Sequence, residues 1–271
     1  MSEKEISLIL RIEGGTANEG LLDIYDAAKT IFGLARSLNL VTHSFANDEE
    51  VRKRNQSADG ANAFIHSSKK GCFEEQVDIH FDAKVVDKIG KSVIANVFWD
   101  YTAWAWSYAI GNQYDPTTPQ VKKIAKANEF FIYDIANALE TPMAELHKSI
   151  VRDKNVTIFL HRPRIGDIVT LNSESLDYVT TREEQIETEY IVGNVTRFNV
   201  LSDFGRLFSD EENQVMSFQL KDDDPRIRGL AVKSMQEHTK GESGKLHFKV
   251  SKIVNARGYV KRYIVYDILE M

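Results

Sequence analysis

The stretch from Lys91 to Gly111 (KSVIANVFWDYTAWAWSYAIG) constrains the fold most, because it is apolar on nearly every side of a helix. It contains all three tryptophans of the chain, Trp99, Trp104 and Trp106. Its polar residues Asn96, Asp100 and Ser107 are spaced by four and seven positions, so they share one narrow stripe. A helix that is apolar except for one stripe is typical of a buried helix whose stripe reaches water or a partner.

Three interpretations of this Trp-rich helix remain open. It is a domain core helix, an oligomer interface, or a segment inserted into a membrane over residues 92–110, whose length approaches the roughly 20 residues of a span. The core interpretation is favoured, since Asp100 at the bilayer centre would cost about 3 kcal/mol. In an oligomer, the interface would consist of Asn96, Asp100, Trp104 and Ser107.

Composition indicates a globular protein with one large or two ordinary domains. The 271 residues are 42% apolar and 27% charged, as in soluble proteins rather than disordered ones. The single cysteine, Cys72, cannot form an internal disulfide, which excludes a disulfide-stapled secreted fold. The first residues, MSEKEISLILRIEGG, lack the apolar core of a signal peptide. We therefore expect a cytoplasmic location.

The N-terminal half predicts an α+β domain over residues 1–153. Apolar residues alternate in residues 5–13, as in a half-buried strand, and recur at helical spacing in residues 19–44. A hairpin with a bulge near Glu74-Glu75 is expected next. The full series of predicted elements is a strand, a helix, the hairpin, the Trp-rich helix and two more helices: 5–13, 19–44, 62–81, 91–111, 120–140 and 141–152.

The C-terminal half predicts a different architecture. Residues 154–186 contain two strand-like segments, which we expect to connect the domains. From residue 187 to 271, five short strands with one inserted helix predict a small closed β-barrel of the OB or SH3-like kind. The predicted fold class is therefore α+β with a C-terminal barrel.

Charge is distributed unevenly along the chain. The net charge of −6 disfavours binding of nucleic acid by the whole protein. Residues 186–271, however, contain 13 basic and 13 acidic side chains, so the deficit lies before them. Any nucleic-acid role would therefore belong to the C-terminal part.

Residues 193–208 (GNVTRFNVLSDFGRLF) are similar to the first two strands of a cold-shock domain. In that family exposed aromatic rings stack on bases while basic side chains meet phosphates. The resemblance implies stacking by Phe198, Phe204 and Phe208, with Arg197 and Arg206 as electrostatic partners. This chain departs from the pattern by placing acidic residues nearby: Asp203, Asp210, Glu211 and Glu212. Alternatively, these glycines and aromatics only build a barrel.

The closing hairpin, residues 245–262, is basic and holds no acidic residue. It could bind an anionic strand or an acidic protein, or its lysines could be the solvated face of an edge hairpin. The predicted partner-binding residues of the hairpin are Lys249, Lys252, Arg257, Tyr259, Lys261 and Arg262.

No catalytic or metal-binding motif is present, and the sequence predicts neither a cofactor nor a metal. The seven histidines show no spacing typical of metal ligands. Only His66 and His80, expected on paired strands, could come close, with Cys72 between them in the chain. Catalysis is therefore not expected, although the sequence leaves it open.

With the hairpin SSKKGCFEEQVDIHF, the apolar helix and the C-terminal barrel, the whole chain resembles an uncharacterised family of prokaryotic proteins. The resemblance implies an α+β N-terminal domain, a five-stranded barrel and, for some members, an origin in mobile elements or phage-conflict loci. It implies no activity.

Three functions follow as hypotheses. The first is a non-enzymatic binding and assembly protein in a phage–host conflict setting, which self-associates through its N-terminal domain and holds a partner on the barrel. The second is single-stranded nucleic-acid binding by the barrel, and the third is a nucleotide receptor or enzyme with a pocket between the domains.

Overall fold

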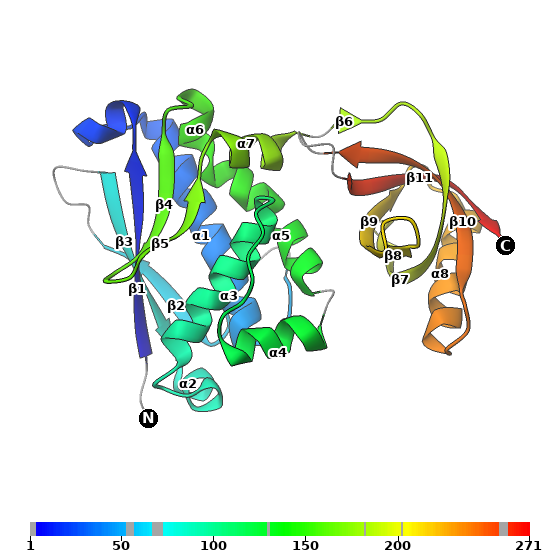
Figure 1. Ribbon diagram of the computed structural model, residues 1–271, viewed down its shortest axis with the longest axis horizontal. Helices are drawn as coiled ribbons and strands as arrows, with labels where there is room; N and C mark the ends of the chain where they lie inside the picture. The colour runs from blue at the N-terminus through cyan, green and yellow to red at the C-terminus, as the bar shows by residue number, and fades with distance from the viewer. Residues whose placement is uncertain are drawn as a thin grey trace. The chain divides into compact units, whose positions relative to one another are not determined.

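The computed structural model describes residues 4–52, 57–66, 73–128, 131–181, 183–201, 203–254 and 260–271. The chain divides into two compact units, Met1–Val179 and Thr180–Met271 (Figure 1). The first is built of helices and a sheet, and the second contains a closed five-stranded barrel. The predicted α+β class is confirmed.

A five-stranded antiparallel sheet forms one layer of the N-terminal unit, in the order β2-β3-β1-β4-β5. The alternation in β1 buries Ile6, Leu8, Leu10 and Ile12 on the face that the helices cover (Figure 1). The strands are β1 (Lys4–Glu13), β2 (Ala61–Ile65), β3 (Phe73–Phe81), β4 (Thr157–Arg162) and β5 (Gly166–Leu171).

The bulge expected near Glu74-Glu75 does not form. The register between β1 and β3 runs without a shift from Lys4 opposite Phe81 to Ile12 opposite Phe73. Glu75 instead occupies an inward position of a regular strand and is buried. Glu75 interrupts the alternation of apolar and polar residues, and the sequence pattern therefore resembled that of a bulge.

Helices form the second layer of the unit. They are α1 (Ile24–Ala46), α2 (Ala83–Ile89), α3 (Ile94–Ala109), α4 (Pro119–Ala127), α5 (Phe131–Leu146), α6 (Lys148–Arg152) and α7 (Ser173–Thr180). The first helix begins later than predicted, because the Asp23 carboxylate caps it by accepting the N–H groups of Tyr25 and Asp26. The short helices α2 and α7 were not predicted.

Helix α5 runs through Pro142, where the sequence predicts the start of a new helix. A proline inside a helix removes one backbone hydrogen bond and favours a break. Here Pro142 and its neighbour Met143 are buried. Packing of this face therefore outweighs the local preference.

Residues 154–186 contribute β4, β5 and α7 rather than a simple connection. Strand β4 pairs with β1, from Ile9 opposite His161 to Glu13 opposite Thr157. The two units divide between Val179 and Thr180, so the first unit extends beyond residue 153.

The Trp-rich helix is α3, and it is buried along nearly its whole length. Its aromatic side chains pack edge-on against neighbours from α1 and β3: the Phe98 ring centroid lies 5.2 Å from that of Phe45 and 5.3 Å from that of Phe81. Such pairs stabilise a core beyond the area they bury. None of the described helices combines the length and apolar character needed to cross a membrane.

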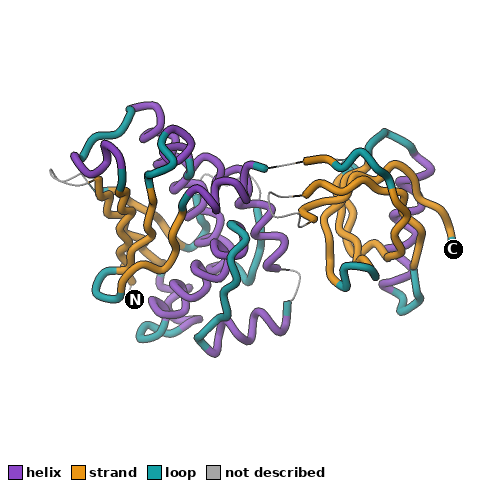
Figure 2. Tube along the Cα trace, turned by 45° about the horizontal axis from the view of Figure 1, so that its top comes forward, coloured by secondary structure: helices purple, strands orange, loops and turns teal. Residues whose placement is uncertain are grey.

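The C-terminal barrel consists of β7 (Glu189–Asn199), β8 (Phe204–Ser209), β9 (Gln214–Leu220), β10 (Lys245–Val254) and β11 (Val260–Glu270), with the two-residue strand β6 (Glu183–Glu184) beside β10. Strand β7 pairs with both β8 and β10, and β11 closes the ring between β10 and β9 (Figure 2). Helix α8 (Pro225–Thr239) connects β9 to β10.

Two features select the OB alternative over the SH3-like one. The helix separates the third and fourth strands of the barrel, and the third strand pairs in parallel with the fifth, Tyr263 beside Phe218. This is the connectivity of an OB-fold, whose second and third strands form its usual binding face.

A glycine allows α1 and α5 to cross closely. A Cβ atom on Gly33 would lie 2.2 Å from the Leu146 backbone nitrogen and 2.7 Å from the Pro142 carbonyl oxygen. Both are main-chain atoms, so the helices themselves would have to move apart.

We expect Gly33→Ala to lower the free energy of unfolding by about 1–3 kcal/mol, the usual cost of overpacking. Gly229→Ala in α8 is the matched control, because a Cβ there meets nothing within 4 Å and should stabilise its helix by about 0.5–1 kcal/mol. Urea unfolding measures both. Equal effects of the two substitutions would contradict the close crossing.

Candidate functional site

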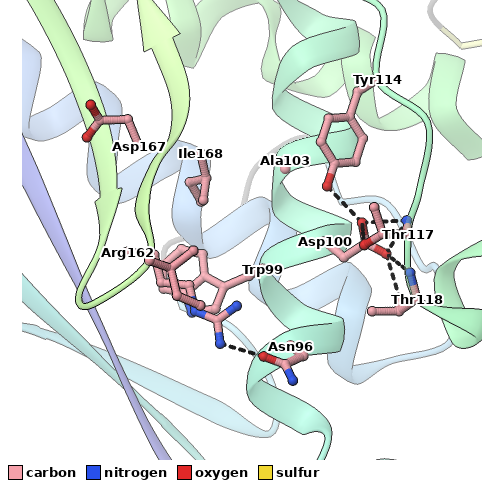
Figure 3. A pocket seen from close by; sticks show the side chains of 11 residues that line it. Asn96, Trp99, Asp100, Ala103, Tyr114, Thr117, Thr118, Arg162, Asp167 and Ile168 are labelled. Atoms are coloured by element: carbon pink, nitrogen blue, oxygen red, sulfur yellow. Dashed lines mark hydrogen bonds between the residues drawn. The ribbon is translucent and has the colours of Figure 1, made fainter.

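A pocket of about 490 Å³ opens beside α3 in the N-terminal unit (Figure 3). Its wall comes from three places: the polar stripe of α3, the segment before α4, and the β4–β5 hairpin. The lining residues are Asn96, Trp99, Asp100, Ala103, Tyr114, Thr117, Thr118, Arg162, Ile165, Asp167 and Ile168. The stripe that the sequence places on one side of the helix therefore faces a cavity.

Asp100 accepts hydrogen bonds from the whole turn before α4 (Figure 3). The Tyr114 hydroxyl donates at 2.8 Å, the Thr117 N–H at 2.9 Å and the Thr118 N–H at 2.7 Å. The two threonine hydroxyls donate as well, at 3.0 and 2.6 Å. The carboxylate thereby fixes the start of α4, where Thr118 is the N-cap before Pro119.

These bonds decide the ionisation of the carboxyl group. Burial, the largest influence, raises the pKa of Asp100, but the hydrogen bonds from Thr118, Thr117 and Tyr114 outweigh it, and the pKa lies below the ordinary 3.8. Burial and the bond to Asp100 raise the pKa of Tyr114 to about 12. At neutral pH the site therefore holds an anion and a neutral phenol.

Arg162 supplies a cation on the other side of the pocket. Its guanidinium donates to the Asn96 side-chain oxygen at 2.5 Å (Figure 3), and Trp99 lines the same pocket. Burial lowers the pKa of Arg162, which means that the charge has lost part of its hydration. Such a cation gains more from an anionic ligand than a fully hydrated one does.

Most polar side chains that line the pocket already have partners within the protein. The residues that line it include no histidine, lysine or cysteine. The two threonine hydroxyls donate to Asp100, and Asp167 is bound by Arg11 at 3.0 Å and His161 at 2.8 Å. Both carboxylates of the pocket are therefore engaged by contacts within the N-terminal unit.

The four residues predicted for an oligomer interface divide between pocket and core. Asn96 and Asp100 line the pocket. Trp104 is 7% exposed, with its ring 5.7 Å from that of Phe131, and Ser107 is buried, its carbonyl accepting the Asn112 N–H. Self-association through these residues stays a prediction.

A second candidate site lies on the outer face of the barrel. Because Leu207 and Tyr263 point inward and are fully buried, their chain neighbours Arg206 and Arg262 point outward. In the strand register, Arg206 lies opposite Arg197 on β7 and opposite Ser217 on β9. On β11, Tyr263 lies beside Phe218 of β9, so Arg262 is level with Ser217. Arg197, Arg206 and Arg262 thus form a row across four strands, the arginine face.

An aromatic ring belongs to the arginine face. The Arg262 guanidinium lies over the Phe204 ring, 5.2 Å from its centroid, as in a cation–π pair. Arg206 is only 4% exposed beneath this surface. The more accessible arginines of this face are therefore Arg197 on β7 and Arg262 on β11, and the half-buried Phe204 ring lies on β8.

The acidic residues that set this barrel apart from a cold-shock domain are largely engaged by bases. Asp203 binds Arg228, and Asp210 binds Lys245, each at 2.5 Å. Lys252 binds Glu189 at 2.5 Å and approaches Glu212 at 3.9 Å. Much of the acidic charge of the C-terminal unit is therefore balanced by bases outside the arginine face.

Of the other predicted binding residues, Phe208 shares the outward side of β8 with Phe204 and Arg206, and the rest lie elsewhere or outside the described residues. Phe198 stacks on Phe218 inside the barrel, with centroids 5.8 Å apart, because Gly205 between them has no side chain. Phe208 is half-buried on β8, Lys249 lies opposite Asp267, and Lys261 points to the other side of β11 from Arg262. Arg257 and Tyr259 lie outside the described residues.

Sequence reasoning missed the pocket residues beyond α3. Arg162, Tyr114 and Thr117 meet Asn96 and Asp100 only after folding, at separations of 14 to 66 positions. One local signal was available: the pair Thr118-Pro119 is typical of a helix start. It did not indicate that Asp100 accepts hydrogen bonds from Thr118.

Comparisons with known proteins give one match. The model of a family described as Domain of unknown function (DUF7946) matches residues 8–180, the N-terminal unit with the pocket. No curated protein and no solved structure matches the chain.

Asp100→Asn should lower the free energy of unfolding at neutral pH by about 2–3 kcal/mol, since charge-assisted bonds are lost and the new amide N–H meets donors. The folded-state pKa of Asp100 lies below its unfolded value, so its stabilising effect is present above about pH 4 and disappears as the pH falls through the folded pKa. Unfolding measured at several pH values should therefore show the wild type and the variant converging in acid. Asp115→Asn, at an exposed site in the same turn, is the control, and an equal loss there would contradict the role of Asp100.

Proposed function

The chain belongs to the family described as Domain of unknown function (DUF7946), and from this starting point we propose that it is a binding protein whose C-terminal barrel holds a single-stranded nucleic acid. The observation that carries the proposal is the arginine face with Phe204, which crosses the second and third strands of an OB-type barrel and has its arginines on the first, second and fifth. OB-folds bind oligonucleotides on this face.

The chemistry fits a single strand better than a duplex. Single-stranded binding combines cations for the phosphates with aromatic rings on which bases stack. Arg197 and Arg262 supply the first, and Phe204 supplies the second, while Arg206 lies beneath them at 4% exposed. Residues 186–271 carry equal numbers of acidic and basic side chains, so attraction comes from this local row and not from a basic domain.

The family match and the barrel concern different parts of the chain. Because the match ends at residue 180, the proposed binding face would be an addition to the family domain. A setting in phage–host conflict has no counterpart among the contacts of the structure and is not part of this proposal.

Arg197→Gln combined with Arg262→Gln should weaken binding of a labelled oligonucleotide of about 12 thymidines, a length within the range that one OB-fold covers. The slope of log affinity against log salt should fall by about 0.7 for each phosphate that the variant no longer neutralises. Fluorescence anisotropy at several salt concentrations measures both, with a duplex of equal length for comparison. Phe204→Ala should cost about 1–3 kcal/mol of binding free energy, typical of removing one base stack.

The matched control is Lys233→Gln with Lys240→Gln, which removes the same charge from α8 and its end. It should leave binding nearly unchanged. Equal weakening by both double variants would mean general electrostatic attraction, and no binding by the wild type would remove the proposal.

A second candidate function concerns the pocket beside α3, which we propose as a receptor for a small anion with a planar group. Its volume of about 490 Å³ falls in the range of ligand sites. The partly desolvated Arg162, in a pocket that Trp99 also lines, favours it. This pocket lies within the N-terminal unit, whereas the sequence suggested one between the domains.

A panel of nucleotides should raise the melting temperature of the wild type, and Arg162→Gln should abolish the rise. Lys123→Gln, on the exposed side of α4, removes the same charge nearby and should keep the rise. No rise with any nucleotide, or a rise that persists in Arg162→Gln, would count against the receptor.

A further inference from the structure

The face of the N-terminal sheet that points away from the helices carries polar side chains on its central strands. The register of β1 and β3 sets Glu5 opposite His80 and Ser7 opposite Asp78. Their chain neighbours Ile6 and Ile79 point into the core. The strict alternation of two antiparallel strands thus gathers a histidine and two carboxylates on one surface.

Strand β2 brings a second histidine to the same place. It pairs with β3 so that Phe64 faces Asp78, and the His66 N–H bonds the Gln76 carbonyl at 2.9 Å just beyond. The Nε2 atom of His66 contacts one oxygen of Asp78. His66 and His80 are therefore close in the fold, as their predicted strands suggested, and Asp78 stands between them on β3.

Asp78 is unusual for an outward-facing carboxylate, because it is only 4% exposed. Ser7, Gln76 and His66 all bond to it, with the Gln76 amide at 3.2 Å from one oxygen. The side chains of His80 and Glu5 remain 38% and 55% exposed. A fixed, buried anion thus lies at the bottom of a cluster that is open to solvent.

The spacing of the donor atoms matches a metal site. The His80 Nε2 atom lies 3.4 Å from a Glu5 carboxylate oxygen, and the ligand atoms of Glu5, Asp78 and His80 all lie within 4.8 Å of one another. Two ligands bound to zinc at about 2.0–2.1 Å with tetrahedral angles stand about 3.3–3.4 Å apart. Within the described part of the chain, no other three such side chains come this close.

We propose that Glu5, Asp78 and His80, joined by His66, bind a divalent transition-metal ion of the zinc class. Two imidazoles and two carboxylates suit Zn²⁺ and similar ions, whereas Ca²⁺ and Mg²⁺ prefer oxygen ligands alone. The ion would take the place of the proton between His66 and Asp78. That imidazole would then ligate through the Nε2 lone pair, with its proton on Nδ1 or released to solvent.

The ion would join β2, β3 and β1, which are neighbours in this order at one edge of the sheet. Glu5 lies near the start of β1, Asp78 and His80 lie on β3, and His66 directly follows the edge strand β2. A metal bond across these strands would hold the edge strand onto the sheet. The site is independent of the arginine face and of the pocket beside α3.

The test is calorimetric titration of the full chain, first freed of metal with a chelator, with Zn²⁺ alone. One ion should bind per chain, and Ca²⁺ should not compete. Co²⁺ in place of Zn²⁺ should give the strong visible absorption of a tetrahedral site. His80→Gln should weaken zinc affinity about 100-fold or more, since even the loss of residues that only support ligands costs 10–100-fold.

Matched variants separate this site from others. His161→Gln alters a histidine on the same sheet that pairs with Asp167 at 2.8 Å, and it should leave zinc affinity unchanged. Asp78→Asn should abolish binding, but the half-exposed His80 gives the decisive result if that variant fails to fold. Absence of zinc binding, or equal binding by His80→Gln and the wild type, would show that the cluster forms only ion pairs and would overturn the proposal.

Discussion

The N-terminal unit depends on the burial of α3. A helix that is apolar on nearly every side is stable only when other elements cover every side. Helices α1 and α5 and the sheet provide this cover, with edge-on rings from Phe45, Phe81 and Phe98 at the centre. The close crossing at Gly33 belongs to the same requirement, because it brings α5 within reach of the core.

Along Asn96 and Asp100 of its polar stripe, α3 borders a pocket instead of packed apolar side chains. Asp100 is a charged group that would be costly to bury without partners, and the turn before α4 provides five donors for it. Beyond them, Asn96 and Arg162 bound a cavity instead of a packed contact. The pocket therefore lies on the one side of α3 that carries polar residues.

The C-terminal barrel shows how a neutral unit can still present a charged surface. Its lysines pair mainly with carboxylates, as Lys245 does with Asp210 and Lys252 with Glu189. The arginine face lies on strands whose inward residues, such as Leu207 and Tyr263, are fully buried. Strand alternation alone then fixes which way Arg206 and Arg262 point.

The sequence by itself determined the features that depend on neighbours along the chain. These are the strands, the Trp-rich helix with its stripe, and the barrel residues Arg197, Phe204, Arg206 and Arg262. Tertiary structure alone decided which distant segments meet: β1 between β3 and β4, Arg162 beside Asn96, Glu5 opposite His80, and a helix continuous through Pro142. Local preference is encoded by residue type and spacing, whereas strand register and helix packing arise from burying the whole core at once, and no short stretch of sequence carries that information.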